Sequence, residues 1–495
     1  MIEKITALAR SSLIYGLGNY GVKLVGFLLI PVYTRYLVPA DYGVMALVSA
    51  FGQALFIFLN LGQSTALFRF YYEDDTPEGR ERVIAGSLLI ALVISTPITL
   101  LALTLSGTTA RLLLGDATKA GLVAVGILTV ACRQLLRLPF AVLRADERDT
   151  RFATWSVVRT ALSAVLAIVL VVGVQLGVWG VLLSQLLAEA ICCAILVPPI
   201  ARSLKAGWVG TEMREQLTFG LALVPGAMAA FTLDLSDRFF LRHYSNLEQV
   251  GLYSLGYRLG EIIFFVVAAV QLAWPQFVFA NRKAPNAKEL YTYATTYYLA
   301  GMLFLVLGLS ALAPEIVQLM AAPQYRAAAP VVPWIALSGL CEGIRYVMTI
   351  GIMFQKRPII RSMGMGVAGL VNVLLNLLLI PRYGMMGAAW ATLGGFVTLI
   401  AIEMTVSHRF YPIPYQLGRF AKLAGVAATL YIASTLIPPG APLAVAAMKA
   451  AMVVVGFPAL LWLVRFFEPA ELEHARRAYA GVRRRLVAGL SRHAT

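Results

Sequence analysis

The chain has 495 residues, of which 59% are hydrophobic and only 13% charged, and its mean hydropathy is +0.77. Soluble globular proteins hold about half apolar and about a quarter charged residues, so this composition excludes a water-soluble domain and indicates a membrane protein. The 41 Lys and Arg against 25 Asp and Glu give a net charge of +16. A net positive charge of this size can indicate nucleic-acid binding in a soluble protein, but the chain has too little polar surface to be one, and nucleic acid is therefore excluded as a partner. The four cysteines lie inside apolar runs and predict neither a disulfide framework nor a metal site.

Apolar segments long enough to cross a bilayer recur along the whole chain. A membrane-spanning helix needs about 20 mostly apolar residues. We predict fourteen, at about 11–32, 42–68, 83–107, 118–139, 152–173, 177–200, 215–237, 249–280, 291–320, 327–353, 360–380, 384–407, 418–437 and 443–466. The first is interpreted as a retained helix, because it is longer than the apolar part of a signal peptide and no cleavage site follows it.

The cations predict the orientation of these spans. With the N-terminus inside, 29 of the 41 Lys and Arg fall in inner segments, 7 in outer loops and 5 within spans. Because cytoplasmic segments carry the excess of Lys and Arg, both termini are predicted to be cytoplasmic. An odd number of spans would destroy this alternation, so the count of fourteen has support independent of hydropathy.

An internal repeat with an offset of 207–208 residues is indicated by three matches. Tyr42-Gly43 matches Val250-Gly251, Arg137 matches Arg345, and the segment 177–180 matches 384–387. The repeat predicts two six-helix lobes of the same orientation, related by an axis along the membrane normal. The expected fold is an all-α polytopic membrane protein with lobes at 1–212 and 213–417, two extra helices at 418–467 and a basic amphipathic tail at 468–495.

The segment from Ser11 to Glu73 resembles the start of polysaccharide-biosynthesis membrane proteins. The resemblance is carried by the sequences GLGN at 16–19, PVYTRYL at 31–37 and DYG at 41–43. The chain is thus similar to Wzx-type flippases of undecaprenyl-diphosphate-linked oligosaccharide, in the multidrug/oligosaccharidyl-lipid/polysaccharide exporter superfamily. The resemblance implies a MATE-like fold, alternating access and a bacterial inner membrane. It also implies a polyprenyl-diphosphate-linked glycan as substrate and other polysaccharide assembly proteins as further partners.

Lys23 lies near the middle of the first predicted span, where a charge is expensive and is expected to face a cavity or a partner. Tyr15, Asn19 and Lys23 recur every four residues and share one helix face. They are interpreted as a cationic cavity wall that contacts a diphosphate or an acidic sugar; the alternative is a lysine paired with a carboxylate for packing. Since the resemblance places the first, second, seventh and eighth helices at the lobe interface, Arg258 is expected to be a second phosphate contact.

Carboxylates and arginines alternate at the end of the seventh and within the eighth predicted span. Asp234 and Arg238 are four residues apart, and Arg258 and Glu261 are three apart, so each pair could neutralise itself. Asp234 and Asp237 could instead bind a coupling cation or proton, or form an outer gate with Arg238. Glu261 belongs to the same candidate group.

Further charged residues within or beside spans are given structural interpretations. Arg159 and Arg345 are expected to pair or to extend to the interface, Glu189 and Glu403 to make inter-helix contacts, Lys449 to extend to the interface, and Asp41 to cap the second span. Glycines at 364, 366 and 369 spell GxGxxG, but within an apolar helix this indicates close helix packing and not a dinucleotide site.

Motifs for catalysis are missing from the sequence, with neither a phosphate-binding GxxxxGK[ST] nor a nucleophile elbow. We therefore expect a transporter and not an enzyme, without a cofactor or metal. Proton, sodium or anion exchange all remain open as the driving force. The rival functions are a cation-coupled multidrug exporter of the same fold and a flippase of a lipid-linked peptidoglycan precursor.

Overall fold

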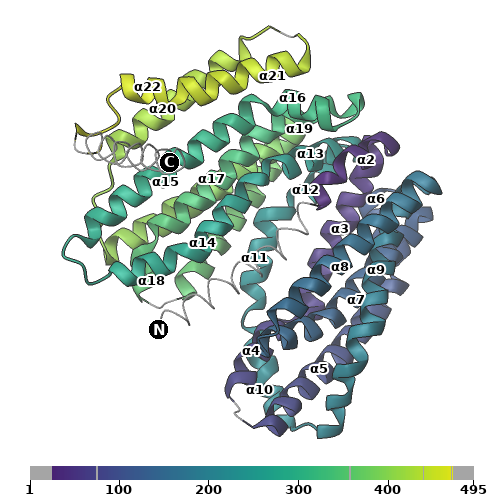
Figure 1. Ribbon diagram of the computed structural model, residues 1–495. Helices are drawn as coiled ribbons and strands as arrows, with labels where there is room; N and C mark the ends of the chain where they lie inside the picture. Colours follow the sequence, from purple (N-terminus) through teal and green to yellow (C-terminus); the bar gives the residue numbers. More distant parts are fainter. Residues whose placement is uncertain (1–24, 74–75, 356–357, 439, 470, 472–495) are drawn as a thin grey trace, which may run out of the picture. The chain divides into compact units, whose positions relative to one another are not determined.

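The computed structural model describes residues 25–73, 76–355, 358–438, 440–469 and 471, and within these ranges it contains helices and no strands (Figure 1). The first half comprises α2 Ile30–Tyr36, α3 Pro39–Asn60, α4 Gln63–Glu73, α5 Pro77–Thr104, α6 Ser106–Leu114, η1 Ala117–Lys119, α7 Ala120–Ala145, α8 Asp149–Ile168, η2 Val169–Gly173, α9 Val178–Ala201, η3 Arg202–Ala206, α10 Gly210–Leu221, α11 Val224–Leu235, α12 Asp237–Tyr244, α13 Leu247–Gly260 and α14 Ile262–Asn281. The second half comprises α15 Ala287–Ala311, α16 Ala313–Met320, η4 Pro323–Val331, α17 Val332–Met348, α18 Ile350–Gln355, α19 Pro358–Phe410, α20 Leu417–Thr435, α21 Pro442–Ala451, η5 Met452–Gly456 and α22 Phe457–Leu463.

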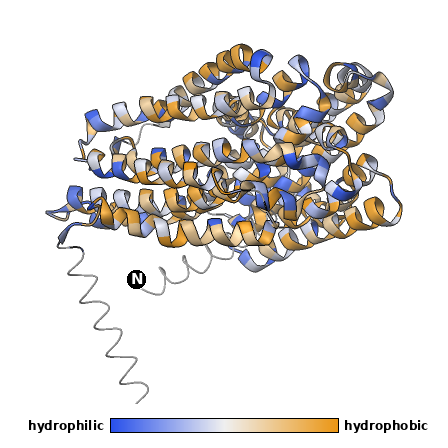
Figure 2. Ribbon diagram, turned by 90° about the horizontal axis from the view of Figure 1, so that it is seen from above, coloured by the Kyte–Doolittle hydropathy of each residue, from blue (hydrophilic) through white to orange (hydrophobic). Residues whose placement is uncertain are grey.

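Eleven helical segments within the described ranges are long and apolar enough to cross a membrane, which confirms the all-α polytopic fold. Hydrophobic residues colour most of the length of these helices in Figure 2. The predicted spans 360–380 and 384–407 lie together in α19, whose helical backbone is interrupted at Gly384. Most of the span 11–32 lies outside the described residues, and 418–437 corresponds to the 19-residue α20. The count of fourteen therefore stays a prediction.

The chain divides into two compact units. The first holds residues up to Arg282 together with Ile316–Pro412, and the second holds Lys283–Glu315 together with the chain from Ile413. Within the first unit α3, α5, α7, α8 and α9 run side by side (Figure 1). The lobe boundaries inferred from the repeat remain a prediction.

The two glycines that open the matched sixth spans have nearly the same unusual backbone. Gly177 has φ 56° and ψ −131°, and Gly384 has φ 53° and ψ −131°. L-residues rarely adopt such a conformation, because Cβ would clash with the backbone, whereas glycine adopts it freely. Two positions 207 residues apart thus share a backbone feature that only glycine accommodates, which supports the repeat.

A second matched pair of glycines lies where α3 crosses α13. A Cβ on Gly43 would lie 2.0 Å from the carbonyl oxygen of Leu247, and a Cβ on Gly251 would lie 1.8 Å from that of Pro39. Pro39 and Leu247 are themselves 208 residues apart, as are the two glycines. The contact is therefore reciprocal, and the two backbones touch at the predicted outer ends of the second and eighth spans.

The start of α3 differs from the prediction. Pro39 occupies the first turn and Val38 is the N-cap, without a side-chain cap, so the expectation that Asp41 caps this helix is wrong. Proline is favoured at this position because its fixed φ suits a helix and its missing N–H would lack an intrahelical partner. Asp41 lies inside the first turn, where its negative charge still complements the helix dipole.

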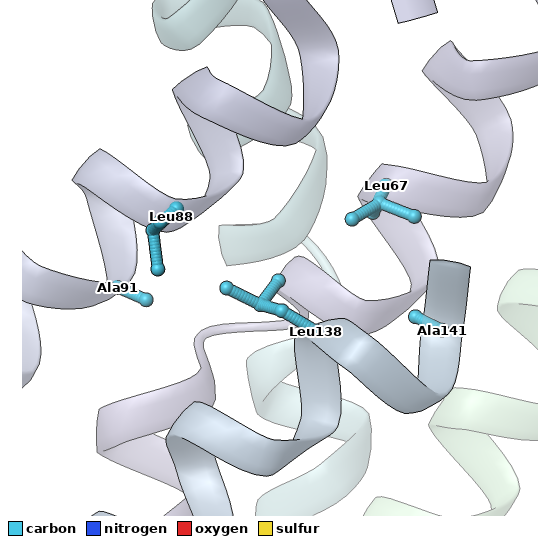
Figure 3. Close-up of a cluster of buried hydrophobic side chains, with 5 residues drawn as sticks. All are labelled: Leu67, Leu88, Ala91, Leu138 and Ala141. Atoms are coloured by element: carbon cyan, nitrogen blue, oxygen red, sulfur yellow. The ribbon is translucent and has the colours of Figure 1, made fainter. Parts of the chain in front are cut away.

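Small and branched apolar side chains form the packing between α4, α5 and α7. Leu67 of α4 meets Leu88 and Ala91 of α5 and Leu138 and Ala141 of α7, and all five are at most 4% exposed (Figure 3). The alanines let the helices approach while the leucines fill the space between them, as is usual where van der Waals packing drives helix association in membranes. This cluster packs α7, the helix that carries three of the arginines described below, against α4 and α5.

The second unit contains a buried ion pair that the sequence interpretation missed. Lys449 of α21 is 6% exposed, and its Nζ lies 2.7 Å from Oε1 of Glu315, also 6% exposed. The expectation that Lys449 extends to the interface is therefore wrong. A lysine at membrane depth is tolerated here because a carboxylate 134 residues earlier in the chain neutralises it.

Candidate functional site

A cavity of about 740 Å³ lies in the first unit. Its walls come from α2, α3, α4, α7, α8 and α9, with one side chain from α13. Among the described residues that line the cavity, six carry a charge at neutral pH. They are five arginines and one glutamate, namely Arg133, Arg137, Arg144, Arg159, Arg258 and Glu189. The described lining therefore has a large excess of positive charge at membrane depth.

Three of these arginines lie on one face of α7. Arg133, Arg137 and Arg144 are spaced by four and seven residues, which places them on one side of a helix. Phenyl rings lie beside the guanidinium groups, with Arg137 5.2 Å from the ring centre of Phe56 and Arg144 4.8 Å from that of Phe68. Such cation–π contacts hold the guanidinium planes without neutralising their charge.

Glu189 of α9 forms the ion pairs of this wall. Its Oε1 accepts a hydrogen bond from Nε of Arg133 at 3.0 Å and one from Nη1 of Arg159 of α8 at 3.4 Å. The expected pairing of Arg159 and the expected inter-helix contact of Glu189 are thus confirmed. One carboxylate links α7, α8 and α9, yet it can offset only one of the two positive charges that it contacts.

Arg137 faces the cavity and has no such partner. Its side chain is exposed, and among the described residues its charged neighbours are Arg133, Arg144 and Arg159. The sequence interpretation counted Arg137 and Arg133 among the inner-segment cations that set topology, and so missed them as cavity residues. Their four-residue spacing, which places both on one helix face, is the sequence signal that could have identified them. The predicted span also ended too early, because α7 extends to Ala145 and so includes both arginines well inside the helix.

Arg258 reaches the cavity from α13. Its guanidinium packs against the backbone of Gly26, where an added Cβ would lie 2.1 Å from Nη2, and its polar neighbours include the phenols of Tyr33 and Tyr42. Within the described residues no ion pair of 4 Å or less joins it to a carboxylate, although the charge of Glu261 acts on it from three residues away. Arg258 is thus a second cation that lines the cavity.

The first predicted span contributes to this cavity through its described end. Val25, Gly26 and Leu29 are among the lining residues. The candidate residues Tyr15, Asn19 and Lys23 lie outside the described part of the chain, so their interpretation as cavity wall stays a prediction.

The other candidate group separates into a buried cluster and a carboxylate beside it. Asp237 is 1% exposed and accepts hydrogen bonds from Nη1 of Arg238 at 3.0 Å, from Oγ1 of Thr392 at 3.3 Å and from the hydroxyl of Tyr253. Arg238 is also buried, 4.5 Å from the ring centre of Tyr257. Burial and pairing exclude extension of Arg238 to the interface, and the cluster joins α12 to α13 and α19.

Asp234 is not part of that ion pair. Arg238 donates to its backbone carbonyl at 3.0 Å and not to its carboxylate. The charged groups that act on the Asp234 carboxylate are Glu342, Asp237, Glu261 and Arg238. Within the described residues, no group of three or more His, Cys, Asp or Glu side chains is arranged to hold a metal ion.

Arg345, the repeat counterpart of Arg137, is fully paired. Its Nη1 lies 3.0 Å from Oε2 of Glu403, and it also forms an ion pair with Glu342 three residues earlier. The expected pairing of Arg345 and the expected inter-helix contact of Glu403 are confirmed. At the position matching Glu342 the first lobe has Gln134, which is 1% exposed and whose amide atoms have no hydrogen-bond partner in the described part.

Comparison with known proteins identifies the family. The family model described as "Polysaccharide biosynthesis protein" matches residues 32–330. The succinoglycan biosynthesis transport protein ExoT of Rhizobium meliloti (strain 1021) is 26% identical over 327 residues, which is 65% of this chain. The match covers 63% of that relative, so the chain spans less than two thirds of its length.

Solved structures agree on the fold. The lipid II flippase MurJ in an inward closed conformation superposes with a TM-score of 0.72 at 12% identity, covering 92% of this chain and all of that one. An inward-facing multidrug MATE transporter of the MOP superfamily gives a TM-score of 0.60 at 16% identity, covering 81% and 96%. These identities are too low to say more than that the chain has the MurJ- and MATE-like fold. Since the family model matches well over half of its residues, the chain belongs to the polysaccharide biosynthesis protein family.

Proposed function

We propose that the chain is a flippase that moves a polyprenyl-diphosphate-linked oligosaccharide across the bacterial inner membrane, with both termini in the cytoplasm. The observation that carries this proposal is the cavity lined by five arginines and one glutamate. A diphosphate is costly to move through hydrocarbon, and arginine binds phosphate oxygens with two parallel hydrogen bonds. Family membership supports polysaccharide assembly as the pathway, and the chain would act as a transporter and not as an enzyme.

Arg258 is the proposed diphosphate contact. Its guanidinium, with the hydroxyls of Tyr33 and Tyr42 nearby, supplies donors that a phosphate group can accept from. Lys23, with Tyr15 and Asn19, would complete this part of the wall from the first span, whose described end already lines the cavity. The polyprenyl tail would remain in the lipid.

Alternating access would come from rocking of the lobes 1–212 and 213–417. The α3–α13 contact at Gly43 and Gly251 closes the predicted outer ends of two spans, so an outward-open state requires this contact to separate. Asp237 and Arg238 lie on the helix before α13 and bind it through Tyr253. We assign Asp237 and Arg238 a gating role. A coupling cation would need the free carboxylate of Asp237, and Arg238 already neutralises it.

Ion coupling is assigned to Asp234, with Glu261 as its neighbour. Asp234 is a carboxylate at membrane depth that no ion pair within the described residues neutralises. Such a group can take up a proton or a single sodium ion, and its charge would then change during the cycle. The two ions are separated by measuring transport with an imposed proton gradient and with an imposed sodium gradient.

A multidrug exporter is the second candidate, favoured by the carboxylates of Asp234, Glu261 and Glu342 and by the MATE-like fold. Drug cations would prefer that acidic group to the arginine-lined cavity. Export of a cationic dye by vesicles containing the protein, at a rate equal to or above that of the lipid-linked glycan, would favour this candidate.

The test uses the full chain reconstituted in vesicles with a fluorescent polyprenyl-diphosphate-linked oligosaccharide. We expect the chain to move the label to the opposite leaflet, and Arg258→Gln to slow this at least tenfold, as expected for loss of a charge-assisted contact to phosphate. Arg151→Gln, an exposed arginine of α8 outside the cavity lining, is the matched control and should retain the rate. Equal rates for the two variants would contradict the proposal.

A further inference from the structure

Arg137 and Arg258, two of the arginines that line the cavity, lie at different levels along it. Two glycine contacts align α3 with α7. A Cβ on Gly126 of α7 would contact Val48 of α3, and a Cβ on Gly52 of α3 would contact Val130 of α7. The two helices therefore run in the same direction, and each residue of α7 lies beside the residue of α3 that is 78 positions earlier in the chain. Arg137 is therefore level with residue 59 of α3. This is sixteen residues from Gly43, or about 24 Å along the helix.

Arg258 lies much nearer to the α3–α13 crossing. Gly251 of α13 contacts Gly43 of α3, and Arg258 lies seven residues after Gly251. Seven residues correspond to about 10 Å along a helix. The difference places Arg258 and Arg137 on the order of 14 Å apart along the helices. The phenol of Tyr42, one of the polar neighbours of Arg258, lies at the crossing itself, which increases the separation. We therefore assign the two arginines to different parts of the ligand.

The surroundings of the two arginines differ in chemistry. Arg258 has phenol hydroxyls as neighbours, which suit a small, strongly charged phosphate group. The rings of Phe56 and Phe140 lie on the Arg137 side of the cavity, beside Arg137 and Arg159, while the amides of Gln53 and Gln185 line it between the two levels and nearer to that of Arg258. Flat apolar faces beside a few hydrogen-bonding groups are the lining expected for sugar rings. The glycan therefore fits the α7 end of the cavity, and the diphosphate fits the α13 end.

The repeat shows that Arg137 lacks a partner that its counterpart has. Arg345 is neutralised by Glu342 and Glu403, whereas Gln134 occupies the position that matches Glu342. Glu189 binds Arg133 and Arg159 and leaves Arg137 exposed among three other arginines. A guanidinium held among like charges attracts an anion, and the one carboxylate of the described cavity lining, Glu189, is already shared by Arg133 and Arg159.

We propose that the glycan is itself acidic, and that Arg137, supported by Arg133 and Arg159, binds a carboxylate on one of its sugars while Arg258 binds the diphosphate. The proposal rests on the proposed flippase function and adds the substrate class. Glu189 has the positioning role of holding Arg133 and Arg159 beside that site. The carboxylate would belong to a uronic acid or to an acidic substituent of a sugar.

The test compares two polyprenyl-diphosphate-linked trisaccharides that differ only in one residue, glucose or glucuronic acid. Binding to the full chain in lipid nanodiscs is measured for wild type, Arg137→Gln, Arg258→Gln and the control Arg151→Gln. We expect wild type and the control to bind the acidic lipid about tenfold more tightly than the neutral one. Arg137→Gln should lose this preference and keep its affinity for the neutral lipid, which also shows that the variant is folded. Arg258→Gln should weaken both equally.

Gln134→Glu is a second variant that keeps every arginine. It gives Arg137 the internal carboxylate that Arg345 has, and should therefore abolish the preference for the acidic lipid as Arg137→Gln does. A preference that survives both variants, or an equal loss for both lipids in Arg137→Gln, would overturn the acidic-glycan proposal alone. Failure of wild type to bind either lipid would overturn the flippase function itself, and the acidic-glycan proposal with it.

Discussion

The two predicted lobes share backbone features but use charge in opposite ways. Both open their sixth span with a glycine of φ near 55°, and both link an arginine of the fourth span to a glutamate of the sixth. In the second lobe Arg345 is enclosed by two carboxylates, while in the first lobe the matching Arg137 faces the cavity among other arginines. The shared links therefore serve the fold, and the unmatched charge of the first lobe is available for a ligand.

The largest expected difference between the lobes concerns these matched arginines. Arg345→Met would leave Glu403, which is fully buried, and Glu342 without their partner, and should lower the free energy of unfolding by about 3–5 kcal/mol. Arg137→Met removes a cation that contacts no carboxylate and relieves repulsion from its neighbours, so it should change stability by less than about 1 kcal/mol. Thermal unfolding in detergent measures both, and equal losses would contradict the difference between the lobes.

The α3–α13 contact predicts the next effect. Gly43→Ala places a methyl group 2.0 Å from a backbone oxygen that cannot move independently, so the outer ends must separate by more than an ångström. Overpacking of this kind costs about 1–3 kcal/mol, and the population should shift toward an outward-open state. Spin-label distances between the outer ends of α3 and α13 report the shift.

Gly251→Ala should have the same effect, because the contact is reciprocal. Gly107→Ala is the matched control, since a Cβ there meets nothing within 4 Å. Longer spin-label distances in the control, or an effect in only one of the two variants, would argue against a shared closing contact.

The glycines that open the sixth spans should give a smaller effect on stability. Gly177→Ala has open space for Cβ, so its cost is the strained backbone alone, about 1–2 kcal/mol. Gly384→Ala adds a clash with the side-chain oxygen of Gln249 at 2.3 Å and should cost more. Thermal unfolding of the two variants, with Gly173→Ala as the unstrained control, measures which substitution lowers stability more. If Gly177→Ala left the stability unchanged, the backbone at Gly177 would no longer support the repeat.

The smallest effect expected is a pH dependence from the Asp116 cap, which has no counterpart at the start of η4. The hydroxyl and the backbone N–H of Thr118 donate to Asp116 and hold its pKa below the usual 3.8. Because the folded-state pKa is depressed, the stabilisation is present above pH 3.8 and is lost as the pH falls through the lower value. In the second lobe, η4 begins after Ala322 without such a cap.

Asp116→Asn isolates this contribution. Thermal unfolding of wild type and Asp116→Asn between pH 3 and 7 should differ at neutral pH by a small amount, since the side chain is exposed, and should converge on acidification. A difference that grows as the pH falls would have the wrong sign and would exclude the cap as its cause.

Much of the fold could be predicted from the sequence because its main determinants are local. Apolar length located the spans, and glycines at one offset located the repeat. The start of α3 was wrong by a few residues, since Pro39 and Asp41 both favour a helix start and only the structure shows which one sets it.

The charged residues were harder to place. An arginine at the end of a span has the same sequence pattern whether it extends to the interface or faces a cavity, so Arg137 was counted with the topology signals. Lys449 was misplaced because its partner Glu315 is distant in the chain. That Arg159 would pair and that Glu189 would make an inter-helix contact could be anticipated from their depth in the spans, but only the structure shows that they contact each other.

The reciprocal contact at Gly43 and Gly251 also bears on how the two halves of the chain could diverge after a gene duplication. Each glycine is required by the backbone of the other half, so a side chain acquired in either copy would disturb both. The matched positions of Arg137 and Gln134 lie away from that contact, and no such mutual requirement acts on them. A duplicated pair of halves is therefore constrained jointly at Gly43 and Gly251.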